Sequence, residues 1–150
     1  MGYKLGTVDG KAVLIKENSY YDIATLSNGA ISSDSVEALK FQSKLSELFE
    51  SLDEKNATGN LSDVELGNPV PNSPNCYAVG LNYRKHAEES GMDIPEVPMI
   101  FTKHTSCFVG PKANVEMRSD YVDWEVELVA VIGKDGKNIP KENAFNHVAG

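Results

Sequence analysis

The residues from Val122 to Gly133 constrain the fold of this chain more than any other segment. Their sequence is VDWEVELVAVIG, in which polar and apolar side chains alternate over the first half. This alternation is typical of a strand, because successive side chains of a strand point to opposite faces. The second half, Leu128 to Ile132, is apolar on both faces and predicts burial at that end. The chain is therefore expected to fold around β-sheet.

A hairpin is predicted at the N-terminus. Asp9-Gly10 separates the apolar runs Leu5 to Val8 and Ala12 to Ile15. An Asp-Gly pair suits a two-residue hairpin turn, because both turn positions need positive φ. A third strand is expected over residues 22–26.

Residues 34–52 predict a helix. Asp34 can serve as its N-cap, and Glu37 lies three residues later as a capping-box partner. The helix is expected to pack on the hairpin through one apolar stripe at helical period. The stripe consists of Phe41, Leu45, Leu48, Phe49 and Leu52.

The composition of residues 53–75 predicts a linker, since this segment holds Gly, Asn and three prolines but few apolar residues. We therefore divide the chain into a small N-terminal α+β domain with its linker, residues 1–72, and a second domain, residues 73–150. The second domain is expected to be incomplete at Gly150, because no stop signal precedes that residue.

The sequence of the second domain predicts short strands and a short helix before the long strand. Strands are expected at residues 77–80 and 98–103. A short helix is expected from Tyr83 to Ser90, closed by Gly91, because glycine is favoured just after a helix end. A further helix is expected over residues 141–148.

Charge and cysteine content exclude several classes of function. The net charge of −8 repels phosphate backbones and anionic membranes, so neither nucleic acid nor membrane is an expected partner. No run approaches the roughly 18 apolar residues of a membrane span, and the N-terminus lacks the features of a signal or transit peptide. Cys76 and Cys107 make a poor disulfide framework, so reduced thiols and a cytoplasmic location are expected.

An acidic face is the first candidate site. Asp123, Glu125 and Glu127 would share one face of the predicted strand. Three adjacent carboxylates repel one another unless solvent or a cation neutralises them. Hard oxygen ligands suit Mg²⁺, Mn²⁺ or Ca²⁺. The alternative is an ordinary solvated strand face.

The remaining candidates are a histidine with a carboxylate and a lysine. His86 and Glu89 are i, i+3 on one helical face, where the carboxylate can orient the imidazole as a general base for water. Lys103 could bind a substrate carboxylate or stabilise an oxyanion. Each has a plain structural alternative, a salt-bridged surface histidine or an ordinary lysine. His104 and His147 are expected to be structural.

Together these segments resemble the fumarylacetoacetate hydrolase family. The resemblance runs through residues 76–150 in the order VGLNYRKHAEE, PMIFTKH, DWEVELVAVIGKDGKNI and AFNHVAG. It is closest to the smaller acylpyruvase-like members and to bacterial decarboxylases or isomerases, including 2-hydroxyhepta-2,4-diene-1,7-dioate isomerases. The first 75 residues resemble, more loosely, the small domain that precedes the catalytic domain. The implied fold is α+β and mainly β, with mixed sheets rolled into a β-barrel-like catalytic domain that forms a homodimer.

The resemblance also implies roles for five residues. Glu125 and Glu127 would be ligands of Mg²⁺ or Mn²⁺, with Ca²⁺ as an alternative. His86 and Glu89 would form a water-activating dyad on a mobile lid helix, and Lys103 would face the substrate. Family members take a third ligand, an Asp, from a strand that would lie beyond Gly150, so the 150-residue chain is expected to be inactive by itself.

The implied activity is that of a metal-dependent hydrolase or lyase acting on C–C bonds. Its substrates would be 2-oxo acids or 1,3-dicarbonyl acids such as acylpyruvates, fumarylacetoacetate-like compounds or oxaloacetate-like compounds. The metal would chelate the carboxylate and the adjacent oxo group and stabilise an enolate. The alternatives are an isomerase, a ureidoglycolate-lyase-like enzyme, or a non-catalytic module if the chain truly ends at residue 150.

Overall fold

The computed structural model describes residues 2–150 and separates the chain into two units. The first unit is Met1–Pro71 with Gly110–Gly150, and the second is Asn72–Val109. The domain division proposed from the sequence, between residues 72 and 73, stays a prediction.

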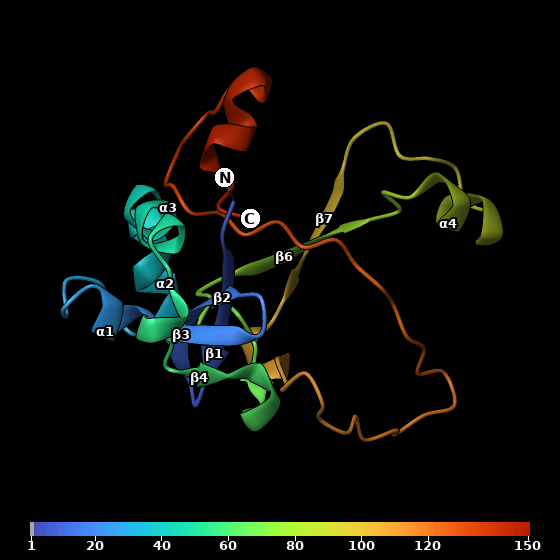
Figure 1. Ribbon diagram of the computed structural model, residues 1–150. Helices are drawn as coiled ribbons and strands as arrows, with labels where there is room; N and C mark the ends of the chain where they lie inside the picture. The colour runs from blue at the N-terminus through green and yellow to red at the C-terminus, as the bar shows by residue number, and fades with distance from the viewer. Residues whose placement is uncertain (1) are drawn as a thin grey trace. The chain divides into compact units, whose positions relative to one another are not determined.

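The first unit contains a five-stranded antiparallel sheet with the strand order β4-β3-β2-β1-β5 (Figure 1). Its strands are β1 (Lys4–Val8), β2 (Lys11–Lys16), β3 (Ser19–Asp22), β4 (Gly59–Asn60) and β5 (Leu66–Gly67). The predicted hairpin is confirmed, because β1 pairs with β2 through a turn in which Asp9 has φ 49° and Gly10 has φ 74°. Positive φ at both positions matches the right-handed twist of the flanking strands.

The third strand lies earlier than predicted, and most of residues 22–26 form helix α1 (Ile23–Leu26). The Asp22 carboxylate accepts a hydrogen bond from the Thr25 backbone N–H at 2.7 Å. This side-chain cap favours a helix start over continued strand pairing, because it satisfies an otherwise unpaired N–H group. The expected strand over residues 22–26 is therefore wrong.

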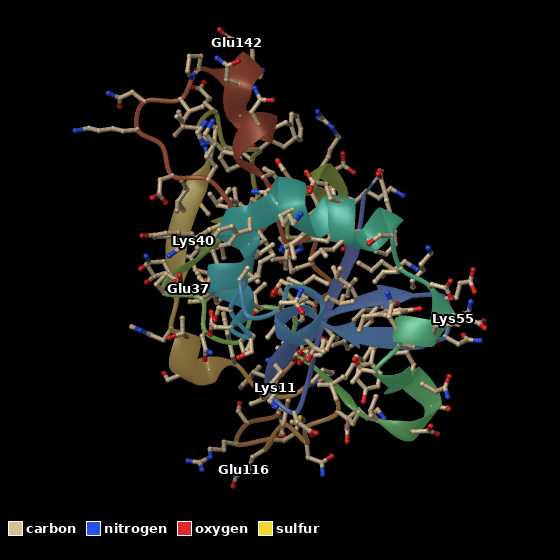
Figure 2. All side chains as sticks on the ribbon, turned by 60° about the vertical axis from the view of Figure 1, so that its left-hand side comes forward. Lys11, Glu37, Lys40, Lys55, Glu116 and Glu142 are labelled. Carbon is tan, nitrogen blue, oxygen red and sulfur yellow. The ribbon has the colours of Figure 1, made fainter. Side chains whose placement is uncertain are left out.

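The predicted helix over residues 34–52 is divided into α2 (Ser35–Ala38), the 3₁₀ turn η1 (Leu39–Phe41) and α3 (Gln42–Glu50). The Asp34 cap is confirmed, since its carboxylate accepts from the Glu37 N–H at 3.0 Å. The capping box does not close: the Asp34 N–H donates to Ser32 Oγ. Glu37 instead pairs with Lys40 at 2.7 Å (Figure 2).

The core of the first unit lies between the helices and one face of the sheet. Phe41, at φ −111° and ψ 39°, interrupts the helix and is the exposed member of the predicted stripe. Leu45 is fully buried, and Leu48 and Phe49 pack against the core. Burying a side chain of this size stabilises a fold by roughly 1.5–3 kcal/mol. The buried cluster is Ala12, Leu14, Tyr21, Ile23, Ile31, Ala38, Leu45 and Leu52.

The segment expected as a linker supplies both edges of the sheet. β4 pairs with β3, and β5 pairs with β1. A Cβ atom at Gly67 would lie 2.6 Å from Thr7 Oγ1, and one at Gly59 would lie 2.9 Å from Tyr20 Cε1. These glycines allow close strand approach, whereas the sequence interpretation took the glycine content as a sign of loop. The 3₁₀ turns here are η2 (Glu54–Asn56) and η3 (Leu61–Asp63).

The second unit confirms its predicted elements. Strand β6 (Cys76–Gly80) pairs antiparallel with β7 (Met99–Lys103), and helix α4 (Arg84–Glu89) lies between them in sequence (Figure 1). Gly91, at φ 63°, closes α4 as predicted. Its N–H donates to Glu88 O at 3.1 Å and the Met92 N–H donates to Ala87 O at 3.0 Å, which is the Schellman pattern. The 3₁₀ turn η4 (Thr105–Cys107) follows β7.

The long strand predicted over residues 122–133 is not formed. Figure 1 shows this segment as an orange coil, and only its end pairs, through an antiparallel bridge between Ile132 and Val148. Leu128 is 89% exposed, so the burial predicted for this end is also wrong. The physical reason is that a strand needs a hydrogen-bonded neighbour, and the described residues supply none for residues 122–130. The helix predicted over residues 141–148 is the 3₁₀ helix η5 (Lys141–His147).

Within the part of the chain that the structure describes, no helix is long and apolar enough to cross a membrane.

Candidate functional site

Helix α4 carries His86 and Glu89 on its exposed surface. Both side chains are exposed, while Ala87 is the buried residue of the helix. Their i, i+3 spacing places them on one helical face. Among residues 2–150 no hydrogen bond or ion pair joins these two side chains, so their dyad role stays a prediction. Tyr83 and Ser90 flank the helix, and the Schellman turn at Gly91 fixes its end.

Strand β7 presents Lys103 next to an aromatic ring. Lys103 Nζ lies 5.4 Å from the centroid of the Phe101 ring, within the range of a cation–π contact. Lys103 is directly opposite Cys76, and Phe101 is directly opposite Ala78. Opposite residues of an antiparallel pair share one face of the sheet, so this face carries an ammonium group, a ring, a thiol and a methyl group. His86 and Lys103 belong to the same unit.

Glu125 and Glu127 lie in the irregular segment of the first unit, and both are exposed. The neighbouring Asp123 carboxylate accepts a hydrogen bond from the Trp124 N–H at 2.8 Å. The exclusion of Asp123 from the ligand set, which followed from the family resemblance, stays a prediction.

The donor chemistry at Glu125 and Glu127 fits Mg²⁺ or Mn²⁺, which prefer carboxylate and water oxygen ligands. The described residues contain no cluster of three or more His, Cys, Asp or Glu side chains placed to hold a metal ion. Two carboxylates are a partial ligand set, so metal binding at these residues stays a prediction.

A surface concavity of about 470 Å³ in the first unit involves none of the five predicted site residues. It is lined by the Asp9-Gly10 turn, by Glu65 and strand β5, and by residues 110–113, which include Lys112. Glu65 and Lys112 form an exposed ion pair at 3.8 Å. An exposed pair of this kind contributes little, about 0–1 kcal/mol.

Comparison with known proteins identifies the family of this chain. The family model described as fumarylacetoacetate (FAA) hydrolase C-terminal matches residues 75–150, the second half of the chain. The chain belongs to the fumarylacetoacetate hydrolase family. The family resemblance inferred from the sequence is confirmed, and all five predicted site residues lie within the matched stretch.

Two curated relatives and one solved structure illustrate the similarity of this family member. The chain is 42% identical over 91 residues to "Oxaloacetate tautomerase fahd2, mitochondrial" of Xenopus laevis, covering 59% of this chain and 28% of that protein. It is 46% identical over 97 residues to "Oxaloacetate tautomerase YisK" of Bacillus subtilis (strain 168), covering 60% of this chain and 32% of that protein. The chain thus spans less than a third of the length of these relatives.

A crystal structure described as an HpcE protein of Mycobacterium smegmatis matches with a TM-score of 0.82 and 35% identity. The match covers 96% of this chain and 51% of that one. The chain therefore shares the mixed, sheet-dominated α and β fold of that protein. The β-barrel-like closure and the homodimer expected from the sequence stay predictions.

Sequence reasoning missed the aromatic partner of Lys103. Phe101 and Lys103 are two residues apart in a segment that was correctly predicted as a strand. The period of two could have identified their shared face. It could not have shown that the lysine side chain folds back over the ring.

Proposed function

We propose that this chain belongs to an enzyme that interconverts the keto and enol forms of oxaloacetate or a closely related 2-oxo acid. The observation that carries the proposal is the 46% identity over 97 residues to a protein named oxaloacetate tautomerase. His86, Lys103, Glu125 and Glu127 all lie in residues 75–150, which match the family model. A relative from a vertebrate carries the same activity in its name. The proposal corresponds to the isomerase alternative of the sequence analysis.

Lys103 would bind the dianionic substrate. The chain has a net charge of −8, so an anionic ligand needs a local cation to bind. Among the residues that the structure describes, no carboxylate forms an ion pair with Lys103, and its ammonium group is exposed on β7. Its three N–H groups can donate hydrogen bonds to a substrate carboxylate.

His86 would move the proton. In the keto-to-enol direction the imidazole accepts a proton from C3 of the substrate, and the C–H electron pair becomes the C2–C3 double bond. The electron pair of the C2=O π bond moves to the C2 oxygen, which takes up a proton from solvent while the imidazolium releases its proton to solvent. The product is therefore an isomer, the imidazole is regenerated, and no other reactant is consumed. Glu89, one helical turn later, would orient the imidazole.

A divalent cation held by Glu125 and Glu127 would supply Lewis-acid stabilisation of the negative charge that develops at the C2 oxygen.

Replacing one carboxylate tests the proposal. In the natural polypeptide that carries these 150 residues, Glu127→Gln should reduce tautomerisation of oxaloacetate in Mg²⁺ by at least about tenfold, because an amide oxygen carries no charge to hold the cation. Asp123→Asn is the matched control, and it should leave the rate unchanged. The assay follows loss of the enol absorbance. A Glu127→Gln protein with the full rate would remove Glu127 from the site.

C–C bond hydrolysis or decarboxylation is the second candidate. It is favoured by the exposed i, i+3 placement of His86 and Glu89, which leaves both groups accessible to water. Here His86 would deprotonate a water molecule that attacks the distal carbonyl. Product analysis separates the two candidates: pyruvate release from oxaloacetate or an acylpyruvate indicates cleavage, and isomerisation without release indicates a tautomerase.

The third candidate is a non-catalytic module without a metal site. The effect of Mn²⁺ on thermal unfolding distinguishes it from a metal-binding enzyme. A specific site stabilises the folded protein by RT ln(1 + [L]/Kd), so Mn²⁺ at 100 times its Kd should add about 2.7 kcal/mol. Scanning calorimetry of the natural polypeptide should therefore show a higher Tm in Mn²⁺, and EDTA should reverse it. An equal Tm in both conditions would favour a module whose acidic residues are only solvated.

A further inference from the structure

We propose that Phe101 is the positioning residue for Lys103: its ring holds the ammonium group in place for the substrate carboxylate. The inference deepens the proposed function and rests on the role given there to Lys103. Lys103 Nζ lies 5.4 Å from the Phe101 ring centroid, inside the roughly 6 Å limit for a cation–π contact.

The strand pairing places the Phe101 ring on the same face of the sheet as Lys103. Phe101 and Lys103 are i, i+2 on β7 and therefore project from one face of the sheet. Directly opposite Phe101 is Ala78, whose methyl group takes little space, and the next residue of β6 on this face is Gly80. A Cβ atom built on Gly80 would lie 3.5 Å from Phe101 Cε1, which is ordinary contact distance.

Along this face of β7, Phe101 lies between Met99, which is opposite Gly80, and Lys103, which is opposite Cys76. The residues of β6 opposite Met99 and Phe101 are therefore small. Phe101 is 48% exposed, and the ammonium group of Lys103 lies over its ring.

A lysine side chain has several rotatable bonds, and immobilising it on binding lowers affinity. Within residues 2–150 the lysine has no acidic partner, and the Phe101 ring is the group that restrains it. Removing the ring should weaken substrate binding more than turnover. A cation–π contact at an exposed site corresponds to a change of about two- to fivefold in KM.

The contact itself is tested without any activity. In the natural polypeptide with ¹³C-labelled lysine, the ring current of Phe101 should shift the Lys103 ε-CH₂ resonance upfield, and Lys103→Met assigns that resonance. Phe101→Leu should return it to the position of the other lysines, while Phe101→Tyr should leave it shifted. A resonance that does not move in Phe101→Leu overturns the proposal.

The positioning role is tested by a double-mutant cycle on oxaloacetate tautomerisation. Phe101→Leu should raise KM by about two- to fivefold with kcat nearly unchanged, and Phe101→Tyr should retain the wild-type KM. In a Lys103→Met background, Phe101→Leu should have no further effect, because the ring acts through the ammonium group. Ile100→Val, on the opposite face of β7, is the control.

The results of these experiments distinguish a failure of the positioning role of Phe101 from a failure of the proposed tautomerase function. An equal loss from Phe101→Leu with and without Lys103 means a structural role for the ring and overturns the positioning role. A wild-type protein without tautomerase activity contradicts the proposed function, and the lysine resonance then decides the contact alone.

Discussion

Tyr3 is a residue whose environment predicts a dependence on pH. Its hydroxyl is buried without a hydrogen-bond partner among the described residues, and its ring packs against the core of the first unit. Burial raises the pKa of the Tyr3 phenol above its ordinary value of 10.0, because the phenolate is poorly solvated there.

The raised pKa fixes the sign of the effect on stability. The folded state binds the phenolic proton more tightly than the unfolded state, so the contribution is fully present below pH 10.0 and is lost as the pH rises through the raised pKa. Tyr3→Phe removes this titration together with the unpaired phenolic hydroxyl. Its stability curve, from urea unfolding between neutral and alkaline pH, should fall less steeply above pH 10.0 than the wild-type curve. Parallel curves would contradict the burial argument.

Residue patterns located the candidate side chains but not their surroundings. Lys103 was identified as a cation in a predicted strand, and the strand is present. The ring of Phe101 beside it depends on a side-chain conformation that spacing does not determine. Metal binding by Glu125 and Glu127 requires further ligands. The presence of two carboxylates in the sequence does not determine how the ligands are arranged in space.

The backbone conformation of the β1–β2 turn predicts how a substitution at Gly10 changes stability. Gly10→Ala places a Cβ atom on a residue with φ 74°, and an L-residue in this region costs about 1 kcal/mol or more relative to glycine. Chemical denaturation should show this loss of unfolding free energy. Gly110→Ala is the control, because no atom lies within 4 Å of its added Cβ and its φ is not in the left-handed region. Equal stabilities for the two variants would mean that the turn conformation does not limit stability.

Elements with local signals were predictable, and elements that depend on distant partners were not. The β1–β2 hairpin, the Asp34 cap and the Gly91 helix end all arise from contacts within a few residues. The strand expected at residues 122–133 needs a neighbouring strand, and its sequence alone could not show whether one is present. The start of α1 at Ile23 depends on the Asp22 cap, which the strand prediction for residues 22–26 does not take into account.

In the whole molecule, exposed large apolar side chains are concentrated in the stretch that matches the family model. Trp124 is 81% exposed and Val126 is 84% exposed, and both lie in residues 75–150. The relatives extend well beyond the portion that this chain matches. The fold class could be predicted because the family pattern is continuous in sequence, while the assembly of the site needs long-range contacts.

Deuterium exchange at C3 of a 2-oxo acid measures directly the proton transfer proposed for His86. Oxaloacetate in D₂O with Mg²⁺ would be followed by proton NMR, with and without the natural polypeptide that carries this chain. We predict that C3 exchange accelerates in proportion to protein concentration, that His86→Ala reduces this acceleration by about 10²-fold or more, and that Lys85→Ala on the same helix retains it. Exchange at the rate of the Mg²⁺ buffer alone would contradict the tautomerase activity, and full acceleration in His86→Ala would contradict the proton-transfer role of His86.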